Sequence, residues 1–437
     1  MKKHNTPKNR TLSLIRTLGS TALKAGNEVL KRKISQSIED STFISDAAVR
    51  LAKGLDDLKG AAMKAGQLLS MVDESILPPG WKDALAKLQS HATAKDWSFI
   101  EPILLQEFGS LEDFEFIEHQ AIHAASIGQV HKGRLKDGTS VAVKVQYPNL
   151  EASVKSDLKS MKKVIKIANL IPNLANYDAV FDAVEHLFMQ ELDFIREKNY
   201  YNLYHERFKS HPNIIVPKTI DQYCTKHVLV TEWVEAESLQ DWLTKNSQEM
   251  HSSPDIMQQR DKLGQILLDL VFTEIFELHH IQSDPNPANF LVTSNADLVL
   301  LDFGATQKLS DDTIENYTKL TQAAFEKKHF ELTRFAKKMG FLTREDPPET
   351  QDSFIKIMEI VMEPFQAESY SWKNCHQLKR INSESLSYMK LTKFRAPTSE
   401  IIFINRRLGG NLIIMEKLGA TVCTKNVMCR ILQKNKE

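Results

Sequence analysis

Three residues in the second half of the chain have types and spacing that suit phosphoryl transfer. Asp284 and Asn289 are five positions apart within Ser283–Phe290, and Asp302 opens an Asp-Phe-Gly tripeptide further along. A carboxylate can orient an acceptor hydroxyl, while carboxamide and carboxylate oxygens can hold Mg²⁺ against the phosphates of a nucleotide. Asp302 follows the apolar run Leu298–Leu301, so a strand, a turn and a second strand would return it to Asn289. The spacing predicts Asp284 as the catalytic aspartate and Asn289 and Asp302 as magnesium ligands.

A lysine at the end of an apolar run is the candidate for binding the phosphates themselves. Lys144 follows Val141–Val143, which has the composition of a half-buried strand. The alternative is that Lys144 simply points to solvent, as most lysines do. Glu191 and Glu197 lie in one charged segment that we predict to be helical. Because they are six positions apart, they would lie on opposite faces and could not both pair with Lys144. Two separate roles are expected, unless the segment is only a solvated helix face.

The segment 123–130, just upstream, can be aligned with a glycine-rich phosphate loop. Gly128 and Val130 match that template, whereas His123 and Ala125 stand where the first two glycines would be. Residues with a Cβ adopt positive φ less readily than glycine, so we expect a stiffer phosphate loop with altered selectivity. The nucleotide-binding residues predicted here are Ala124, Ala125, Ser126, Gly128 and Val130.

The composition is that of an ordinary folded protein. The length of 437 residues suits two or three packed units, and 56 basic residues balance 56 acidic ones, which gives no whole-chain argument for nucleic acid. We find neither a secretory signal nor an apolar run of about 18 residues, so we expect a soluble or peripheral protein. The cysteines have no C-x-x-C spacing, which argues against a zinc site or a disulfide framework and favours a reducing compartment. They are Cys224, Cys375, Cys423 and Cys429.

The elements that must position these residues begin with helices. Residues 11–36 place leucines, Ile15 and Val29 among lysines and arginines, which suits an amphipathic helix. Packing on the protein's own body is the favoured interpretation, and contact with a membrane surface is the secondary one. A second helical pattern begins near Asp46 and runs through Lys64-Ala65-Gly66-Gln67. A proline pair and a glycine at 78–80 end it before a short third helix.

The middle of the chain changes to short β-branched runs, and the remainder is mostly helical. The predicted strands of an antiparallel sheet are Ile127–Val130, Val141–Val145 and Val228–Val234. Leu263–Ile281 is apolar nearly all round, which indicates a buried helix. Two further short strands, Asn289–Thr293 and Leu298–Leu301, interrupt the helical part. The fold class predicted from this order is α+β.

Seven motifs in this order give the chain a strong resemblance to the UbiB/ADCK family of atypical kinases. They are KAGQ, AASIGQVH, VAVK, ELDFIRE, SDPNPANF, LDFG and INRRLGG, and they extend the resemblance from about residue 11 to residue 425. Gln282, two places before Asp284, resembles the coenzyme-Q-linked branch.

The resemblance implies a bilobal protein-kinase-like fold with a helical N-terminal KxGQ extension. The domains that follow from it are a basic amphipathic segment at 1–45, the KxGQ extension at 46–118, a β-rich N-lobe at 119–234 and a helical C-lobe at 235–437.

The resemblance also implies roles for single residues. Lys144 would contact the nucleotide phosphates with Glu197 as its ion-pair partner, and the adenine edge would meet the backbone of Glu232, Trp233 and Val234.

Further residues would belong to elements typical of the family. Glu191 and Asp193 resemble its E-x-D element, and Lys64 and Gln67 resemble the residues that reach over the active site. Such a covered site would leave no room for an extended peptide.

Some residues depart from the family pattern or leave a choice open. His123 stands where a third alanine is usual, which puts the selectivity of the phosphate loop in question because an imidazole can carry charge near neutral pH. Ala288 replaces a common glycine, a milder change. Arg406 and Arg407 could bind a lipid phosphate or form a buried ion pair in the C-lobe.

These observations predict an atypical kinase or ATPase that uses ATP or ADP with Mg²⁺ and supports ubiquinone (coenzyme Q) biosynthesis. Its substrate would be a small molecule or lipid rather than a peptide. The alternatives are a nucleotide-gated, membrane-associated regulatory module without phosphotransfer and a conventional protein kinase. Expected partners are the nucleotide, an anionic membrane surface, lipids or enzymes of the quinone pathway and a second copy of the chain, but not nucleic acid. The expected location is the cytoplasm or an organelle matrix, peripheral to a membrane.

Overall fold

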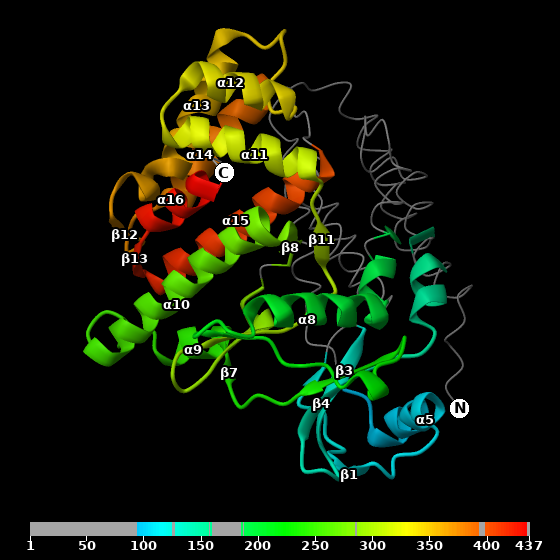
Figure 1. The fold of residues 1–437 in the computed structure, drawn as a ribbon. Coiled ribbons are helices and arrows are strands. Elements are labelled where there is room, and N and C mark those ends of the chain that lie inside the picture. The colour runs from blue at the N-terminus through cyan, green and yellow to red at the C-terminus, as the bar shows by residue number, and fades with distance from the viewer. Residues whose placement is uncertain are drawn as a thin grey trace, which may run out of the picture. The chain divides into compact units, whose positions relative to one another are not determined.

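The computed structural model describes residues 94–124, 127–156, 158–159, 185–186, 188–284, 286–392 and 398–434. The chain divides into two compact units (Figure 1). The first unit comprises Met1–Lys198 and Thr219–Trp233, and the second comprises Asn199–Lys218 and Val234–Glu437. Four of the predicted site residues lie outside the described residues, namely Lys64, Gln67, Ala125 and Ser126. The predicted helices before residue 94 lie outside them as well.

An antiparallel sheet forms the first unit, with strand order β1-β3-β4-β6 and a short β2 paired to β3. The turn between β3 and β4 contains Gly138 at φ 91°, and its amide donates to Leu135 O at 2.9 Å. Glycine adopts this left-handed conformation without steric cost. The strands are β1 (Phe114–Ile117), β2 (His123–Ala124), β3 (Gly128–Leu135), β4 (Ser140–Gln146) and β6 (Val228–Glu232).

Alternate residues of the central strands build the core of this unit. Val141, Val143 and Val145 on β4 are completely buried, as expected for a strand with one face on a core. Helix α5 (Trp97–Phe108) adds Ile100 and Leu104 to the same cluster. The three predicted strands are therefore present, although β3 continues to Leu135 and β6 ends at Glu232. Within the segment predicted as a helical extension to residue 118, the described end is α5 followed by β1, which pairs with β3.

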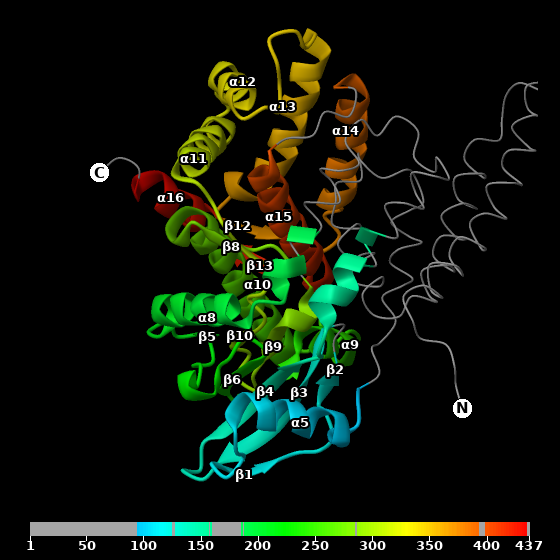
Figure 2. The ribbon, with the colours of Figure 1, turned by 90° about the vertical axis from the view of Figure 1, so that its right-hand side faces the viewer.

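A long buried helix organises the second unit. Helix α10 (Pro254–Thr273) begins with proline at its first turn and lies alongside α15 (Ser399–Leu418) in both views (Figures 1 and 2). A Cβ on Gly264 would lie 2.5 Å from Ala420 Cβ, so only glycine allows this close approach. Hydrophobic burial along α10 thus fixes the element that leads toward the segment with Asp284 and Asn289.

The predicted helix Leu263–Ile281 is correct in kind but wrong at its end. After α10 the chain makes a π-helical turn, Glu274–Leu278, and His279 then adopts the left-handed conformation at φ 55°. Ile281 is instead the centre of strand β8 (His280–Gln282), which pairs with β11 (Thr306–Lys308). The left-handed residue ends the helix because it redirects the backbone, and periodicity does not report such a change.

The strand, turn and strand predicted before Asp302 are present. Strand β9 (Phe290–Val292) pairs antiparallel with β10 (Leu298–Leu300), and β5 (Ile214–Ile215) and β7 (Glu237–Ser238) complete a sheet in the order β5-β10-β9-β7. Beyond the hairpin, Leu301 N donates to Asn289 O at 3.0 Å. The hairpin therefore returns the chain to Asn289, as expected from the sequence.

The remaining elements of the second unit are mainly helices, with α11 to α14 gathered toward one end of it (Figure 2). Helix α8 (Phe194–Phe208) begins in the first unit and belongs to the second from Asn199 onward. Among the described residues, no helix is long and apolar enough to cross a membrane. The others are α9 (Leu239–Lys245), α11 (Asp311–Phe325), α12 (His329–Lys338), α13 (Pro348–Met362), α14 (Gln377–Leu391) and α16 (Lys425–Lys434), with β12 (Ser369–Ser371) paired to β13 (Thr421–Cys423).

Candidate nucleotide and magnesium site

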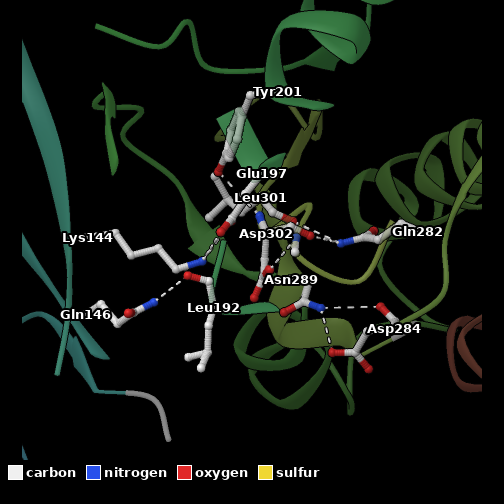
Figure 3. Close-up of polar contacts among 11 residues, drawn as sticks. Lys144, Gln146, Leu192, Glu197, Tyr201, Gln282, Asp284, Asn289, Leu301 and Asp302 are labelled. Carbon is white, nitrogen blue, oxygen red and sulfur yellow. Dashed lines mark hydrogen bonds and ion pairs between the residues drawn. The ribbon is translucent and has the colours of Figure 1, made fainter. Parts of the chain in front are cut away.

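The first unit pairs the predicted phosphate-binding lysine with a buried glutamate. Lys144 Nζ lies 2.7 Å from Glu197 Oε1 and 2.9 Å from Oε2 (Figure 3). The ammonium group also lies 5.0 Å from the centre of the Phe194 ring. The lysine side chain is 20% exposed, whereas the glutamate side chain is 1% exposed. Lys144 is therefore held by a buried carboxylate and still reaches solvent, which suits a cation that receives a ligand.

A helix start explains why Glu197 and not Glu191 pairs with this lysine. Asp193 accepts a hydrogen bond from Arg196 N at 3.0 Å, which caps the first turn of α8. Glu197 lies one turn into that helix, while Glu191 precedes a break at residues 192–193 and is buried. The expectation that both glutamates lie on one helix is thus wrong, because the cap at Asp193 interrupts it.

The predicted phosphate loop is described only at its two ends. His123 and Ala124 form β2, which pairs with Val130 and Gln129 of β3. A Cβ on Gly128 would lie 2.2 Å from Val145 O, so any other residue would collide with the neighbouring strand. The glycine retained in this alanine-rich loop is therefore required by strand packing as well.

The predicted adenine-binding segment follows the edge of β6. Glu232 is the last residue of that strand, and Trp233 N donates to Ser140 O at 2.9 Å. The Trp233 ring also receives Lys132 Nζ at 4.7 Å from its centre. The Trp233 amide is already used by the sheet, so it is not a donor for an adenine edge.

In the second unit, the predicted catalytic segment brings Asp284 and Asn289 together. Asn289 Nδ2 donates to Asp284 Oδ2 at 3.0 Å and to Asp284 O at 3.3 Å (Figure 3). Between them, Asn286 Oδ1 accepts from Ala288 N and begins a short 3₁₀ turn with Pro287 at its first position. This turn closes the five-residue spacing, so the two side chains face each other.

Asp302 adopts an unusual backbone conformation that hydrogen bonds to it and to Leu301 support. Its φ is 58°, in the left-handed region that residues with a Cβ rarely adopt. Gln282 Nε2 donates to Leu301 O at 3.1 Å and also to Asp302 O (Figure 3). The Asp302 amide donates to the Tyr201 hydroxyl oxygen at 3.3 Å, and Gly304 N donates to Asp302 Oδ1 at 3.2 Å. Backbone strain at a residue whose side chain could bind a metal is typical of functional sites.

Tyr201 is the residue that sequence reasoning missed. It stands four positions after Glu197 on α8, and its ring packs against Phe303 with centroids 4.6 Å apart. The helical spacing from Glu197 was the available signal, since residues four apart share a helix face.

The donor set of the second unit fits Mg²⁺. Because the Asn289 nitrogen points to Asp284, its carboxamide oxygen points away from Asp284, where it can act as a ligand (Figure 3). A carboxamide and a carboxylate are the oxygen ligands that Mg²⁺ prefers, with phosphates and waters completing the shell. No cluster of three or more His, Cys, Asp and Glu side chains suited to a metal occurs in the described part of the chain. Asn289 and Asp302 could thus supply two of the oxygen ligands of such an ion.

The two arginines of α15 have different surroundings. Arg406 Nη2 lies 3.5 Å from Asp284 Oδ1, and both side chains remain partly exposed. Arg407 is completely buried and donates from Nε to Glu274 Oε2 at 2.7 Å. For Arg407 the structure therefore resolves the open choice in favour of a buried ion pair.

Comparison with known proteins decides the family. Residues 87–335, more than half of the chain, match the family described as ABC1 atypical kinase-like domain. The chain belongs to this family. The UbiB/ADCK resemblance expected from the motifs is thereby confirmed.

Relatives from other organisms align with nearly the whole chain. It is 28% identical to the probable serine/threonine-protein kinase abkA of Dictyostelium discoideum, over 96% of this chain and 79% of that protein. It is 29% identical to the mitochondrial atypical kinase coq-8 of Caenorhabditis elegans, over 90% of this chain and 52% of that protein. It is 27% identical to the mitochondrial atypical kinase COQ8 of Saccharomyces cerevisiae, over 97% of this chain and 85% of that protein. The chain thus spans about half of the nematode protein and most of the other two.

A solved structure supports the fold. The Rv3197–erythromycin complex from Mycobacterium tuberculosis superposes with a TM-score of 0.63 at 24% identity, covering 90% of this chain and 97% of the other. The α+β, kinase-like fold expected from the sequence is confirmed.

Proposed function

We propose that this protein is an ATP- and Mg²⁺-dependent atypical kinase or ATPase that supports ubiquinone biosynthesis. The observation that carries the proposal is the β9–β10 hairpin, which returns the chain to Asn289 while Asn289 holds the carboxylate of Asp284. The family match and the COQ8 relatives place this geometry in a group of atypical kinases.

Each side chain would then have one task. Lys144, oriented by Glu197, binds the α and β phosphates of the nucleotide whose Mg²⁺ is held by Asn289 and Asp302. Mg²⁺ held by Asn289 and Asp302 would supply positive charge beside the phosphates. Asp284 accepts a hydrogen bond from the attacking hydroxyl or water and orients it, and Asn289 keeps that carboxylate in place. Since phosphoryl transfer requires mainly positioning and charge stabilisation, these groups suffice for the reaction.

We further propose a small-molecule or lipid acceptor in place of a peptide. The support is the KxGQ motif of the sequence, Lys64 and Gln67, which in the family covers the active site. On the same ground, Glu191 and Asp193 act with that extension. Partial association with an anionic membrane, in the cytoplasm or an organelle matrix, agrees with the basic pattern of residues 11–36.

A hydrolysis assay tests the proposal. The wild-type protein and Asp284→Asn are compared for release of phosphate from ATP with Mg²⁺, alone and with anionic liposomes, with quinone-precursor phenols or with a mixed peptide library. We expect Mg²⁺-dependent turnover that liposomes and phenols increase and that Asp284→Asn reduces by about 100-fold or more. Turnover that depends on peptide, with phosphate transferred to it, would overturn the choice of acceptor.

One contact favours a second candidate, a nucleotide-gated regulatory module. Arg406 lies within 3.5 Å of the Asp284 carboxylate and would compete with an acceptor hydroxyl for it. In that case ATP would change the affinity for a membrane or partner enzyme while no condition produced turnover above that of Asp284→Asn.

A further inference from the structure

The second unit contains a completely buried ion pair that the proposed reaction does not use. Arg407 and Glu274 side chains are 0% and 1% exposed, and Arg407 Nε lies 2.7 Å from Glu274 Oε2. The two terminal nitrogens of Arg407 are buried without a hydrogen-bond partner among the described residues. Buried ion pairs add little stability compared with apolar residues of similar size, so this costly pair calls for a role in positioning.

Glu274 connects the pair to the residue that holds Asp302. Its Oε1 accepts from Gln282 N at 3.3 Å, and Gln282 in turn donates from Nε2 to the carbonyl groups of Leu301 and Asp302. Glu274 begins the π-helical turn after α10. Such π-helical turns are frequent at functional sites.

The same carboxylate reaches the residue after Asp302 through a tyrosine. Tyr204 donates its hydroxyl to Glu274 Oε1 at 2.9 Å, and its ring packs on Phe303 with centroids 4.5 Å apart. Burial and the neighbouring Glu274 carboxylate raise the pKa of the Tyr204 hydroxyl, so it stays a donor at any physiological pH.

Arg407 contacts the residue next to Asn289, the other predicted magnesium ligand. Its guanidinium carbon lies 5.6 Å from the centre of the Phe290 ring, and Phe290 is adjacent to Asn289. A desolvated guanidinium over an aromatic face is an attractive contact with a defined geometry.

From these contacts we infer that the Arg407–Glu274 pair is the positioning centre for the magnesium ligands of the proposed site. It touches Gln282, Phe290 and, through Tyr204, Phe303, and these stand two, one and one positions from Asp284, Asn289 and Asp302. Groups that orient metal ligands from the second layer typically change metal affinity by about 10- to 100-fold when removed. The inference rests on the proposed Mg²⁺–nucleotide binding.

The test measures the Mg²⁺-dependent gain in nucleotide affinity, the ratio of Kd values for a fluorescent ATP analogue without and with Mg²⁺. The double variant Glu274→Met/Arg407→Met removes both charges at once, and Gln282→Met removes the donor to the carbonyl groups of Leu301 and Asp302. We expect both variants to bind the analogue like the wild type without Mg²⁺ and to lose about 10-fold or more of the gain. Arg407→Lys, which keeps a cation for Glu274, should retain most of it.

Arg260→Met is the matched control for a purely structural loss. Arg260 is also a buried arginine, 4% exposed, and donates to Met250 O at 2.9 Å. It precedes Glu274 by fourteen residues along α10 and its π turn, about 21 Å at the rise of an α-helix. This variant should lose stability and keep the full Mg²⁺-dependent gain.

Three results would overturn the inference. If Gln282→Met kept the full Mg²⁺-dependent gain in affinity, the inference would be wrong even if the double variant failed to fold. If Arg260→Met lost as much of the gain as the other variants, the inference would also be wrong. If the wild type itself showed no Mg²⁺-dependent gain, the proposed function and this inference would both fail. If the wild type and Gln282→Met both showed the full gain, the inference would fail while the proposed function would stand.

Discussion

Two ion pairs, one in each unit, use the same chemistry in opposite surroundings. In the first unit, Lys144 is 20% exposed while its partner Glu197 is 1% exposed. In the second, Arg407 and Glu274 are both sealed from solvent, at 0% and 1%. A partly exposed cation can bind a phosphate while its buried partner orients it, whereas a sealed ion pair can only hold neighbouring groups in place. The solvent exposure of the cation, more than the presence of an ion pair, therefore distinguishes a binding role from a positioning role.

The largest expected effect concerns the sealed pair. Arg407→Met leaves the Glu274 carboxylate buried without its cation and should lower the free energy of unfolding by about 3–5 kcal/mol. Urea denaturation followed by tryptophan fluorescence would measure it. The double variant Glu274→Met/Arg407→Met should recover most of that loss, because an apolar replacement of both partners is often neutral. If the double variant were less stable than Arg407→Met, the sealed pair would be a net source of stability. Its burial would then be no argument for a positioning role.

The solvated pair should give the converse result. Lys144→Met should cost only about 1–2 kcal/mol of stability, because water can reach Glu197 from the side that the lysine leaves. Nucleotide affinity should fall by about 10-fold or more, since the cation for the phosphates is lost. Isothermal titration with ATP and urea denaturation of the same variant would test both parts. Wild-type affinity in Lys144→Met would place the phosphates elsewhere.

A smaller effect of pH is expected from the first unit. His131 is completely buried; its Nδ1 lies 2.7 Å from Glu118 O and its Nε2 2.9 Å from Gln129 Nε2. Burial lowers the pKa of His131 below its ordinary value of 6.5. The unfolded chain therefore binds a proton at His131 more readily than the folded chain. The contribution of His131 to the free energy of unfolding is thus fully present above about pH 6.5 and is lost as the pH falls from this value toward the lower pKa of the folded state.

The urea midpoint measured between pH 7.5 and 5.5 checks this expectation. His131→Gln keeps a polar side chain but cannot titrate, and its midpoint should fall less than that of the wild type over the interval. Parallel curves for the two proteins would show that His131 makes no contribution to the pH dependence.

Short-range patterns made most of the site predictable. Asp284 and Asn289 belong to one turn, and Asp302 returns through a hairpin of adjacent strands, so the spacing alone brought them together. Arg407 and Glu274 are 133 positions apart, and no local pattern links residues so distant. The break before Phe194 was also missed, since the charged residues around it continue a helical composition while the capping by Asp193 depends on one side chain.

The most direct test of the account is nucleotide binding to Asp302→Asn. The substitution keeps size and the hydrogen bond from Gly304 but removes the charge that would hold Mg²⁺. Thermal unfolding of wild type and variant is measured with ATP, with and without Mg²⁺. If Asp302 holds Mg²⁺, ATP should stabilise the wild type in a Mg²⁺-dependent way and should give no such stabilisation in Asp302→Asn. Equal stabilisation of the two proteins would contradict the magnesium site.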